Sequence, residues 1–437
     1  MAEDTPGAPD VLNLVAGGVR PSEAAAAVRR PDVVPLEVCP RAFIIQPSLV
    51  NIYVLETDDG LVMIDSGLAT DADAVFAAVR GRFDAPLHTV VFTHGHLDHA
   101  FGLRRFLDAG ERPRIVAHEN VTRRFDTYMR TARLNSLVNK RQWQLPFLPW
   151  APSTPGDFIW PDVTYRDALD LRIGGERFAL RHAKGETDDH TWVWVPGRKL
   201  LASGDFFCMT MPNCGNPNKV LRYPEEWADA DEEMAALGAE IMLPGHGQPI
   251  LGSERIRSGL LEQAEFLRSI VAQTLAGLNA GLRHDEIARS IRIPEHLADL
   301  DHLQPTYDRP EFIARNVIRR YGGWFDGYAA DLLPAAGEEI AAEVVGLAGG
   351  TDQLVARARE LAETNLALAC HLAEWAYLAN PDDPHARACV VEVFTRRADA
   401  DPSLMSKGVY MRLVRTADGS YEPESEDAPS QPGPGAP

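Results

Sequence analysis

"TVVFTHGHLDHAFGLRRFL", residues 89–107, decides the fold of this chain, because it joins a short apolar strand to a helix start through a loop crowded with metal-binding groups. These groups are three histidines and an aspartate, His94, His96, Asp98 and His99. His94 and His96, two positions apart, can point the same way from an extended segment. Asp98 and His99 lie one turn further on and can face a second ion. The spacing therefore predicts a site for two metal ions on a loop at the edge of a sheet.

Short apolar runs typical of strands occur on both sides of this loop. They lie at residues 51–56, 61–65, 89–93, 114–118, 177–183, 191–195, 199–205 and 240–246. Stretches that favour helices interrupt them at 71–81, 99–109 and 225–238. Strands that alternate with helices predict a layered α/β domain. After about residue 253 the strand signal ends and apolar residues recur at helical spacing, which predicts a mostly helical remainder.

The length of 437 residues predicts a large catalytic domain and a smaller second one. We expect the catalytic domain at 36–252, with an insertion at 122–161 that builds the pocket. A helical region should follow at 253–415. Residues 416–437 have almost no apolar content and should form a disordered tail.

The composition restricts the partners of the protein. Lys and Arg number 43 against 63 Asp and Glu, a formal net charge of -20, which argues against binding of nucleic acid. An anionic substrate remains compatible with this charge, because a bound metal can dominate the local field. The five cysteines are scattered without a C-x-x-C pair, which favours reduced thiols in a cytoplasmic protein. We expect neither a signal peptide nor a membrane span, since no apolar run approaches roughly 20 residues.

The motif "THGHLDH" (93–99) resembles the signature of the metallo-β-lactamase superfamily, whose fold is an αβ/βα sandwich. The resemblance implies where the remaining ligands lie. "GETDDHTWVWV" places His190 directly before a strand, and "LLASGDFF" places Asp205 at a strand end. "IMLPGHGQPI" places His246 in a glycine-flanked turn after another strand. All three follow in the order that the superfamily requires.

The resemblance thus assigns seven ligands to two ions. His94, His96 and His190 would bind one ion, Asp98, His99 and His246 the other, and Asp205 both. Asp98 and Asp205 are the expected catalytic carboxylates. Asp65, in "VMIDSG", matches the first motif of the superfamily and would orient the histidine loop, although a turn-capping aspartate gives the same pattern.

Five neutral imidazoles, two carboxylates and two divalent ions leave such a site positively charged, which favours an anionic substrate. Nitrogen and oxygen ligands suit zinc best, and iron or manganese can occupy the same set. Two such ions lower the pKa of a bridging water from roughly 15.7 toward about 7 and so supply a hydroxide nucleophile. The predicted reaction class is hydrolysis by a dinuclear zinc enzyme.

The segment 122–161 begins with a basic helical half and ends in a half rich in Trp, Phe and Pro. This mixture suits an amphiphile with an anionic head, and we expect Lys140 and Arg141 to bind that head. A solvated basic face over a small satellite core explains the same composition. Further candidates for anion contacts are Asn213, Lys219 and Arg222.

"RNVIRRYGGWFDGYAADLLP" (315–334) resembles a segment of the alkyl sulfatase branch, in which a helical dimerisation domain follows the metallo-β-lactamase fold. The resemblance implies a homodimer that hydrolyses an anionic ester such as an alkyl sulfate. That branch commonly carries glutamates where His190 and Asp205 stand here. The alternatives are a thioesterase, lactonase or β-lactamase-like hydrolase, an iron-dependent dioxygenase or oxidoreductase, and a non-catalytic dimer scaffold.

Overall fold

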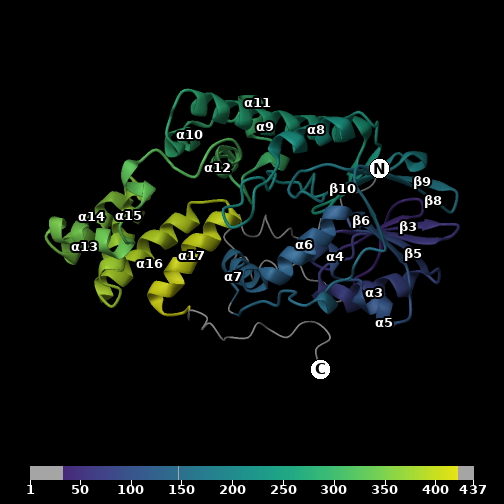
Figure 1. Ribbon diagram of the computed structural model, residues 1–437, viewed down its shortest axis with the longest axis horizontal. Helices are drawn as coiled ribbons and strands as arrows, with labels where there is room; N and C mark the ends of the chain where they lie inside the picture. Colours follow the sequence, from purple (N-terminus) through teal and green to yellow (C-terminus); the bar gives the residue numbers. More distant parts are fainter. Residues whose placement is uncertain (1–32, 146, 422–437) are drawn as a thin grey trace.

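Two β-sheets face each other in the computed structural model, which describes residues 33–145 and 147–421 (Figure 1). The seven strands of the first sheet are neighbours in chain order: β1 (Leu36–Cys39), β2 (Ala42–Ile45), β3 (Ile52–Thr57), β4 (Gly60–Ile64), β5 (Leu87–Val91), β6 (Arg114–His118) and β7 (Val163–Tyr165). The second sheet has the order β13 (Ile250–Leu251), β12 (Ile241–Pro244), β11 (Leu200–Gly204), β10 (Thr191–Val195), β9 (Glu176–His182) and β8 (Ala168–Ile173).

Each sheet combines antiparallel and parallel pairs. Strands β1 to β4 are antiparallel, whereas β4, β5, β6 and β7 run parallel. In the second sheet only β11 and β12 are parallel. Parallel strands end at the same edge of a sheet, so the loops that follow β4, β5, β11 and β12 can meet there.

The strands are apolar on both faces because each sheet is covered on both sides. On β3, Tyr53 and Leu55 enter the core between the sheets, together with Val193 and Leu243 from the second sheet. The alternate residues of β3 enter a different core on the outer side of the first sheet. Helices supply that outer cover: α3 (Ala72–Arg82), α5 (Arg104–Asp108) and α6 (Glu119–Arg130). The expected αβ/βα sandwich is confirmed.

The helix expected at 99–109 is broken in two, α4 (Leu97–Ala100) and α5. Gly102 lies at the break, and a Cβ there would stand 2.0 Å from the carbonyl oxygen of Ser66. Tertiary packing against the chain after β4 therefore interrupts a locally favourable helix. Strands β1, β2, β7, β8 and β13 were not expected from the sequence, because they are short or alternate with polar residues.

The chain after the sandwich is helical. Its helices are α9 (Ser253–Asn279), α10 (His284–Ser290), α11 (Glu295–Ala298), α12 (Pro310–Tyr321), α13 (Gly337–Ala348), α14 (Thr351–Ala362), α15 (Leu366–Ala379), α16 (Pro384–Asp399) and α17 (Leu404–Asp418). Helix α9 shares a core with α8 (Pro224–Ala235) and the second sheet. Helices α13 to α17 form a core of their own. The expected boundary at 252/253 therefore separates strands from helices but does not separate cores.

The C-terminal end differs from the expected tail. Helix α17 continues through residues 416–418, and residues 422–437 lie outside the described part of the chain. Among the described residues, no helix is both long enough and apolar enough to cross a bilayer.

Candidate metal centre

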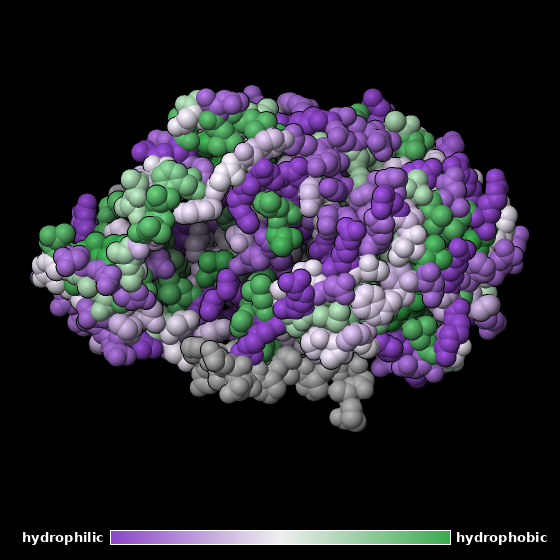
Figure 2. Space-filling view, in the orientation of Figure 1, coloured by the Kyte–Doolittle hydropathy of each residue, from purple (hydrophilic) through white to green (hydrophobic). Residues whose placement is uncertain are grey.

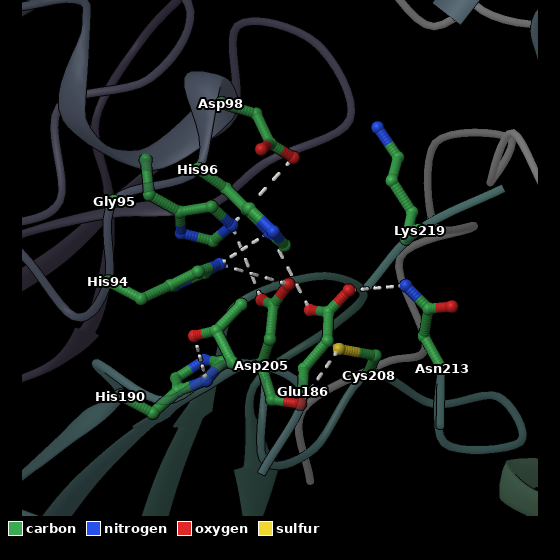
Figure 3. A network of polar contacts seen from close by, with 12 residues as sticks. His94, Gly95, His96, Asp98, Glu186, His190, Asp205, Cys208, Asn213 and Lys219 are labelled. Carbon is green, nitrogen blue, oxygen red and sulfur yellow. Dashed lines mark hydrogen bonds and ion pairs between the residues drawn. The ribbon is translucent and has the colours of Figure 1, made fainter. Parts of the chain in front are cut away.

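The carboxyl ends of four parallel strands deliver the candidate residues to one edge of the sandwich. Asp65 follows β4, the histidine loop follows β5, Asp205 follows β11 and His246 comes two residues after β12. The side chains of His94, His96, Asp98 and Asp205 lie close together in Figure 3. The topology therefore brings together residues that lie up to 181 positions apart in the chain, from Asp65 to His246.

A first group of potential ligand atoms comes from His94, His96, Glu186 and Asp205, and these atoms lie within 4.8 Å of one another. His94 Nε2 stands 2.8 Å from His96 Nδ1 and 3.8 Å from Asp205 Oδ2. His96 Nδ1 is 3.8 Å from Glu186 Oε2. Two imidazoles and two carboxylates thus converge on one point.

A second group comes from Asp98, His99 and His246. The carboxylate of Asp205 lies against this group as well, with Oδ1 3.3 Å from His99 Nε2 and Oδ2 3.4 Å from His246 Nε2. Asp98 Oδ2 is 3.6 Å from His246 Nε2. Asp205 therefore stands between the two groups, as a carboxylate shared by two cations would.

The residues fit divalent cations. His99 Nε2, His190 Nε2 and Asp205 Oδ1 are buried without any hydrogen-bond partner. Unpartnered buried polar atoms are costly, and an ion that they coordinate removes the cost. Imidazole and carboxylate are the donor set that zinc prefers when thiolates are absent.

Asp65 holds the histidine loop from behind. Its carboxylate accepts hydrogen bonds from the backbone N–H of Thr93 at 2.7 Å and from the Thr93 hydroxyl at 2.8 Å. Its Oδ2 also lies 2.7 Å from His99 Nδ1, on the side of the ring opposite to the cluster. This contact constrains the orientation of the imidazole.

The sequence reading missed Glu186, which the fold brings into the first group. His190 is not in that group; its ring stacks on that of His94, with 4.0 Å between centroids. Glu186 stands four residues before His190, in "KGETDDH". Three acidic side chains in this short loop gave no local signal for which one faces the cluster.

A buried network around Asp189 fixes the same loop and was also missed. Asp189 Oδ2 accepts from the backbone N–H of Gly95 at 3.0 Å and from Arg124 Nε at 2.8 Å. Its other oxygen accepts from Thr187, whose hydroxyl lies 3.1 Å from His190 Nδ1. Arg124 belongs to α6, so the insertion braces the histidine loop.

Electrostatics differ between the two groups. Burial, aided by the imidazoles of His190 and His99, holds the pKa of His94 well below its usual value. Burial likewise lowers the pKa of His190 to about 3. These rings are neutral at neutral pH, the form that binds a metal. For His246, burial acts to lower the pKa, but Asp205 outweighs it and raises the pKa to about 9. The second group therefore attracts positive charge.

Two of the candidate anion contacts are already engaged. Arg222 Nη1 is 2.9 Å from Glu186 Oε1, and the Asn213 amide also donates to that carboxylate. Lys219 is different. Its ammonium donates one long hydrogen bond, 3.3 Å, to Asn139, and its side chain extends beside the cluster (Figure 3). Burial lowers the pKa of Lys219 to about 8.

Lys140 and Arg141 lie on α7 (Ala132–Gln142), in the helical half of the insertion. Lys140 is only 4% exposed, and its ammonium lies over the ring of Tyr421, 4.5 Å from the centroid. Arg141 Nη1 donates to Asn218 Oδ1 at 2.8 Å. Both basic groups therefore have protein partners away from the cluster.

The aromatic half of the insertion is part of the core. Phe158 is buried, and Trp150 and Trp160 pack beside it against the outer core of the first sheet. The ring of Phe158 is 4.7 Å from that of Phe125, centroid to centroid. This half therefore packs on the outer core of the first sheet, and the expected satellite core is not separate.

The sandwich, with its histidines and aspartates at the strand ends, defines a metal-dependent hydrolase. Residues 45–246 match the family model described as the metallo-beta-lactamase superfamily, and residues 283–418 match the model described as alkyl sulfatase dimerisation. The chain thus combines a metallo-β-lactamase superfamily domain with an alkyl sulfatase dimerisation domain and is alkyl sulfatase-like.

Curated relatives align over most of this chain. A linear primary-alkylsulfatase of a Pseudomonas species is 28% identical over 84% of this chain and 74% of its own length. The alkyl/aryl-sulfatase BDS1 of Saccharomyces cerevisiae is 25% identical over 70% of this chain, which spans 52% of that protein. The solved structure of a stereoselective inverting sec-alkylsulfatase from Pseudomonas has the same fold, with a TM-score of 0.81, 21% identity and coverage of 98% of this chain and 71% of its own.

Proposed function

We propose that this protein hydrolyses alkyl sulfate esters with two divalent ions, which we infer to be zinc. The observation that carries the proposal is the shared position of Asp205 between two groups of imidazoles and carboxylates, with the Lys219 ammonium beside them. The alkylsulfatase relatives supply the substrate class. Iron or manganese suits the same ligands, so the metal content of the isolated protein is part of the test.

In this proposal the ligands divide between two ions. The first ion would be held by His94, His96, Glu186 and Asp205, and the second by Asp98, His99, His246 and Asp205. Such ions would supply a water molecule of lowered pKa as the nucleophile at neutral pH.

The chain's own groups complete the chemistry. Lys219 would bind the sulfate through its ammonium, because it makes one long hydrogen bond, whereas the neighbouring Arg124 and Arg222 pair with carboxylates. Asp98 is the most open carboxylate, with 24% of its side chain exposed against 7% for Asp205 and 5% for Glu186. Asp98 is thus placed to accept the proton that the attacking water gives up. Burial raises the pKa of Glu186 to about 8, and Arg222 opposes this shift while its ion pair holds the carboxyl group at the cluster.

The proposed reaction is tested with the metal-loaded full chain on a panel of decyl sulfate, dodecyl sulfate, a lactone, a thioester and nitrocefin. Release of inorganic sulfate from the alkyl sulfates, with little turnover of the other compounds, is the expected result. Faster turnover of the lactone, the thioester or nitrocefin would show that this compound, and not the sulfate ester, represents the substrate class. Bound iron in the isolated protein, with an absorption band in the visible range, would instead favour an oxidoreductase.

Glu186 and His190 are competing candidates for the first ion, and paired variants decide between them. We expect Glu186→Gln to weaken metal affinity by at least about tenfold, because it removes a charged oxygen donor. His190→Gln should have a smaller effect, since its ring stacks on His94 and stands outside the group. Metal titration of both variants measures this, and a larger loss in His190→Gln would return His190 to the ligand set.

Lys219→Met should raise the KM for decyl sulfate about ten- to a hundredfold, because a charge-assisted contact is lost. Metal content should remain unchanged, as should the KM for any uncharged ester that the enzyme accepts. Lys199→Met is the matched control, since Lys199 is exposed and pairs with Glu240 at 2.6 Å. Equal changes for charged and uncharged substrates would show that Lys219 shapes the pocket without binding the anion.

We infer a homodimer built through the region after α12. Between α12 and α13 the chain exposes Trp324 by 71% and Leu333 by 90%, and apolar side chains gather over the end of the molecule formed by α13 to α15 (Figure 2). Large exposed apolar patches mark interfaces. Sedimentation at micromolar concentration should give the mass of two chains, and Trp324→Glu with Leu333→Glu should shift it to one chain. A wild-type protein that sediments as a single chain would rule the dimer out.

A further inference from the structure

We propose that Gly408 is a positioning residue for the Lys219 ammonium, the anion contact proposed beside the candidate metal centre. It lets α17 dock directly on the backbone of α7, and α7 in turn fixes the ammonium of Lys219. The inference rests on the proposed function, because it concerns how the same site holds its anionic substrate. It links α17 to the candidate catalytic domain.

Gly408 lies inside α17, where glycine is a poor choice unless packing requires it. A Cβ at this position would stand 2.8 Å from the carbonyl oxygens of both Arg141 and Gln142, and 3.0 Å from the Gln142 Cα. All three atoms are backbone, so no side chain can rotate to make room. Any larger residue at 408 must therefore push the last turn of α7 away from α17.

Further contacts make this junction specific. Arg415, on α17, donates from Nη1 to the carbonyl oxygen of Gln144 at 2.8 Å. Ser403 caps α17 and donates to the carbonyl oxygen of Tyr307 at 2.8 Å, while the Tyr307 hydroxyl accepts from Gln142 Nε2 at 2.8 Å. Helix α17 and the segment before α12 thus hold the end of α7 from two sides. In Figure 1, α17 lies beside α7 accordingly.

Helix α7 makes two polar contacts with residues 218 and 219, beside the candidate metal centre. Asn139 Oδ1 accepts from the Lys219 ammonium at 3.3 Å, and Arg141 donates to Asn218, the neighbour of Lys219, at 2.8 Å. These contacts hold the 216–219 turn against α7. A displaced α7 would carry Asn139 away and leave the ammonium without the acceptor that directs it.

The test compares Gly408→Ala and Gly408→Val with wild type and with Gly81→Ala. Gly81 is a helical glycine of α3 where an added Cβ has no neighbour within 4 Å, so it controls for the chemistry of the substitution. The metal-loaded full chain is titrated with decyl sulfonate, an amphiphilic anion that cannot be hydrolysed as an ester. Deuterium uptake of residues 132–145 reports on α7 independently of activity.

Gly408→Ala should weaken decyl sulfonate binding about tenfold, and Gly408→Val more, while metal content stays constant. Uptake in 132–145 should rise in both variants and not in Gly81→Ala. In a Lys219→Met background, Gly408→Ala should cause no further loss, because the two changes act through one contact. If Gly408→Ala weakened decyl sulfonate binding as much in the Lys219→Met variant as in wild type, the effect would not depend on Lys219. If deuterium uptake of 132–145 rose while binding stayed unchanged, Gly408 would not position the anion contact.

Arg415→Gln is the second variant, should the Gly408 variants fail to fold. This substitution weakens the contact between α17 and α7 without adding volume. It should therefore raise the deuterium uptake of 132–145 and the dissociation constant for decyl sulfonate. An unchanged dissociation constant would overturn the inference. Failure of the proposed function looks different. A wild type that binds decyl sulfonate but does not hydrolyse decyl sulfate would refute the hydrolysis while leaving the role of Gly408 standing.

Discussion

Asp205→Ala should lower kcat/KM for decyl sulfate by roughly a thousandfold or more, because the shared carboxylate keeps both ions, and with them the activated water, in place. The expected metal content falls from two ions per chain to one or none. Asp205 is 3.3 Å from His99 and 3.4 Å from His246 through different oxygens, so no neighbour can replace it at both positions. Metal analysis and initial rates on the same preparation measure the two effects together.

Asp205→Asn separates charge from shape. It keeps an oxygen of the same reach but removes the negative charge, so we expect partial metal retention and an intermediate loss of rate. Asp170→Ala, at an exposed carboxylate on β8 that pairs with Arg177 and Arg181, should change neither quantity. Two ions and full activity in Asp205→Ala would show that the shared position has been misassigned.

Gly245→Ala should be the most damaging substitution that removes no functional group. A Cβ on Gly245 would lie 2.0 Å from Asp205 Oδ1 and 3.0 Å from the carbonyl carbon of Gly204. The Gly245 backbone cannot retreat, since its N–H donates to the Gly204 carbonyl oxygen at 2.8 Å and its own carbonyl accepts from Asn51 at 2.9 Å. The carboxylate must therefore turn away, and we expect activity and metal affinity to fall by about ten- to a hundredfold.

The matched control for Gly245→Ala is Gly197→Ala. Gly197 lies in the turn between β10 and β11 of the same sheet, and a Cβ there meets nothing within 4 Å. This variant should retain wild-type metal affinity and rate. Wild-type behaviour of Gly245→Ala would mean that Asp205 tolerates a different rotamer, which would count against a tightly shared carboxylate.

Much of the candidate site could be predicted from the sequence, because its residues lie close together in the chain or directly after strands. His94, His96, Asp98 and His99 occupy six consecutive positions, so their spacing alone brings them together. The apolar strands before Asp205 and His246 predict a buried sheet whose ends carry polar residues. The resemblance to the superfamily and to its alkyl sulfatase-like branch could likewise be recognised from "THGHLDH" and "YGGWFDG".

Other features depend on contacts that no local pattern encodes. Glu186 and His190 share one loop, and only the ion pair with Arg222 and the Asp189 network decide which side chain faces the cluster. The break at Gly102 arises because the helix meets the chain after β4, a contact between residues 36 positions apart.

The basic residues show the same division. Lys140 and Arg141 stood out in the sequence because they are adjacent and next to aromatic residues, yet Tyr421 and Asn218 contact these two groups. Lys219 gave a weaker signal, and Asn139 of α7 accepts a hydrogen bond from its ammonium beside the cluster. The sequence by itself determined the fold class, the histidine loop and the family, because strand periodicity and consecutive ligands are local properties. Tertiary structure decided which carboxylate and which cation lie beside the histidine cluster, because those positions depend on burial and on hydrogen bonds between segments far apart in the chain.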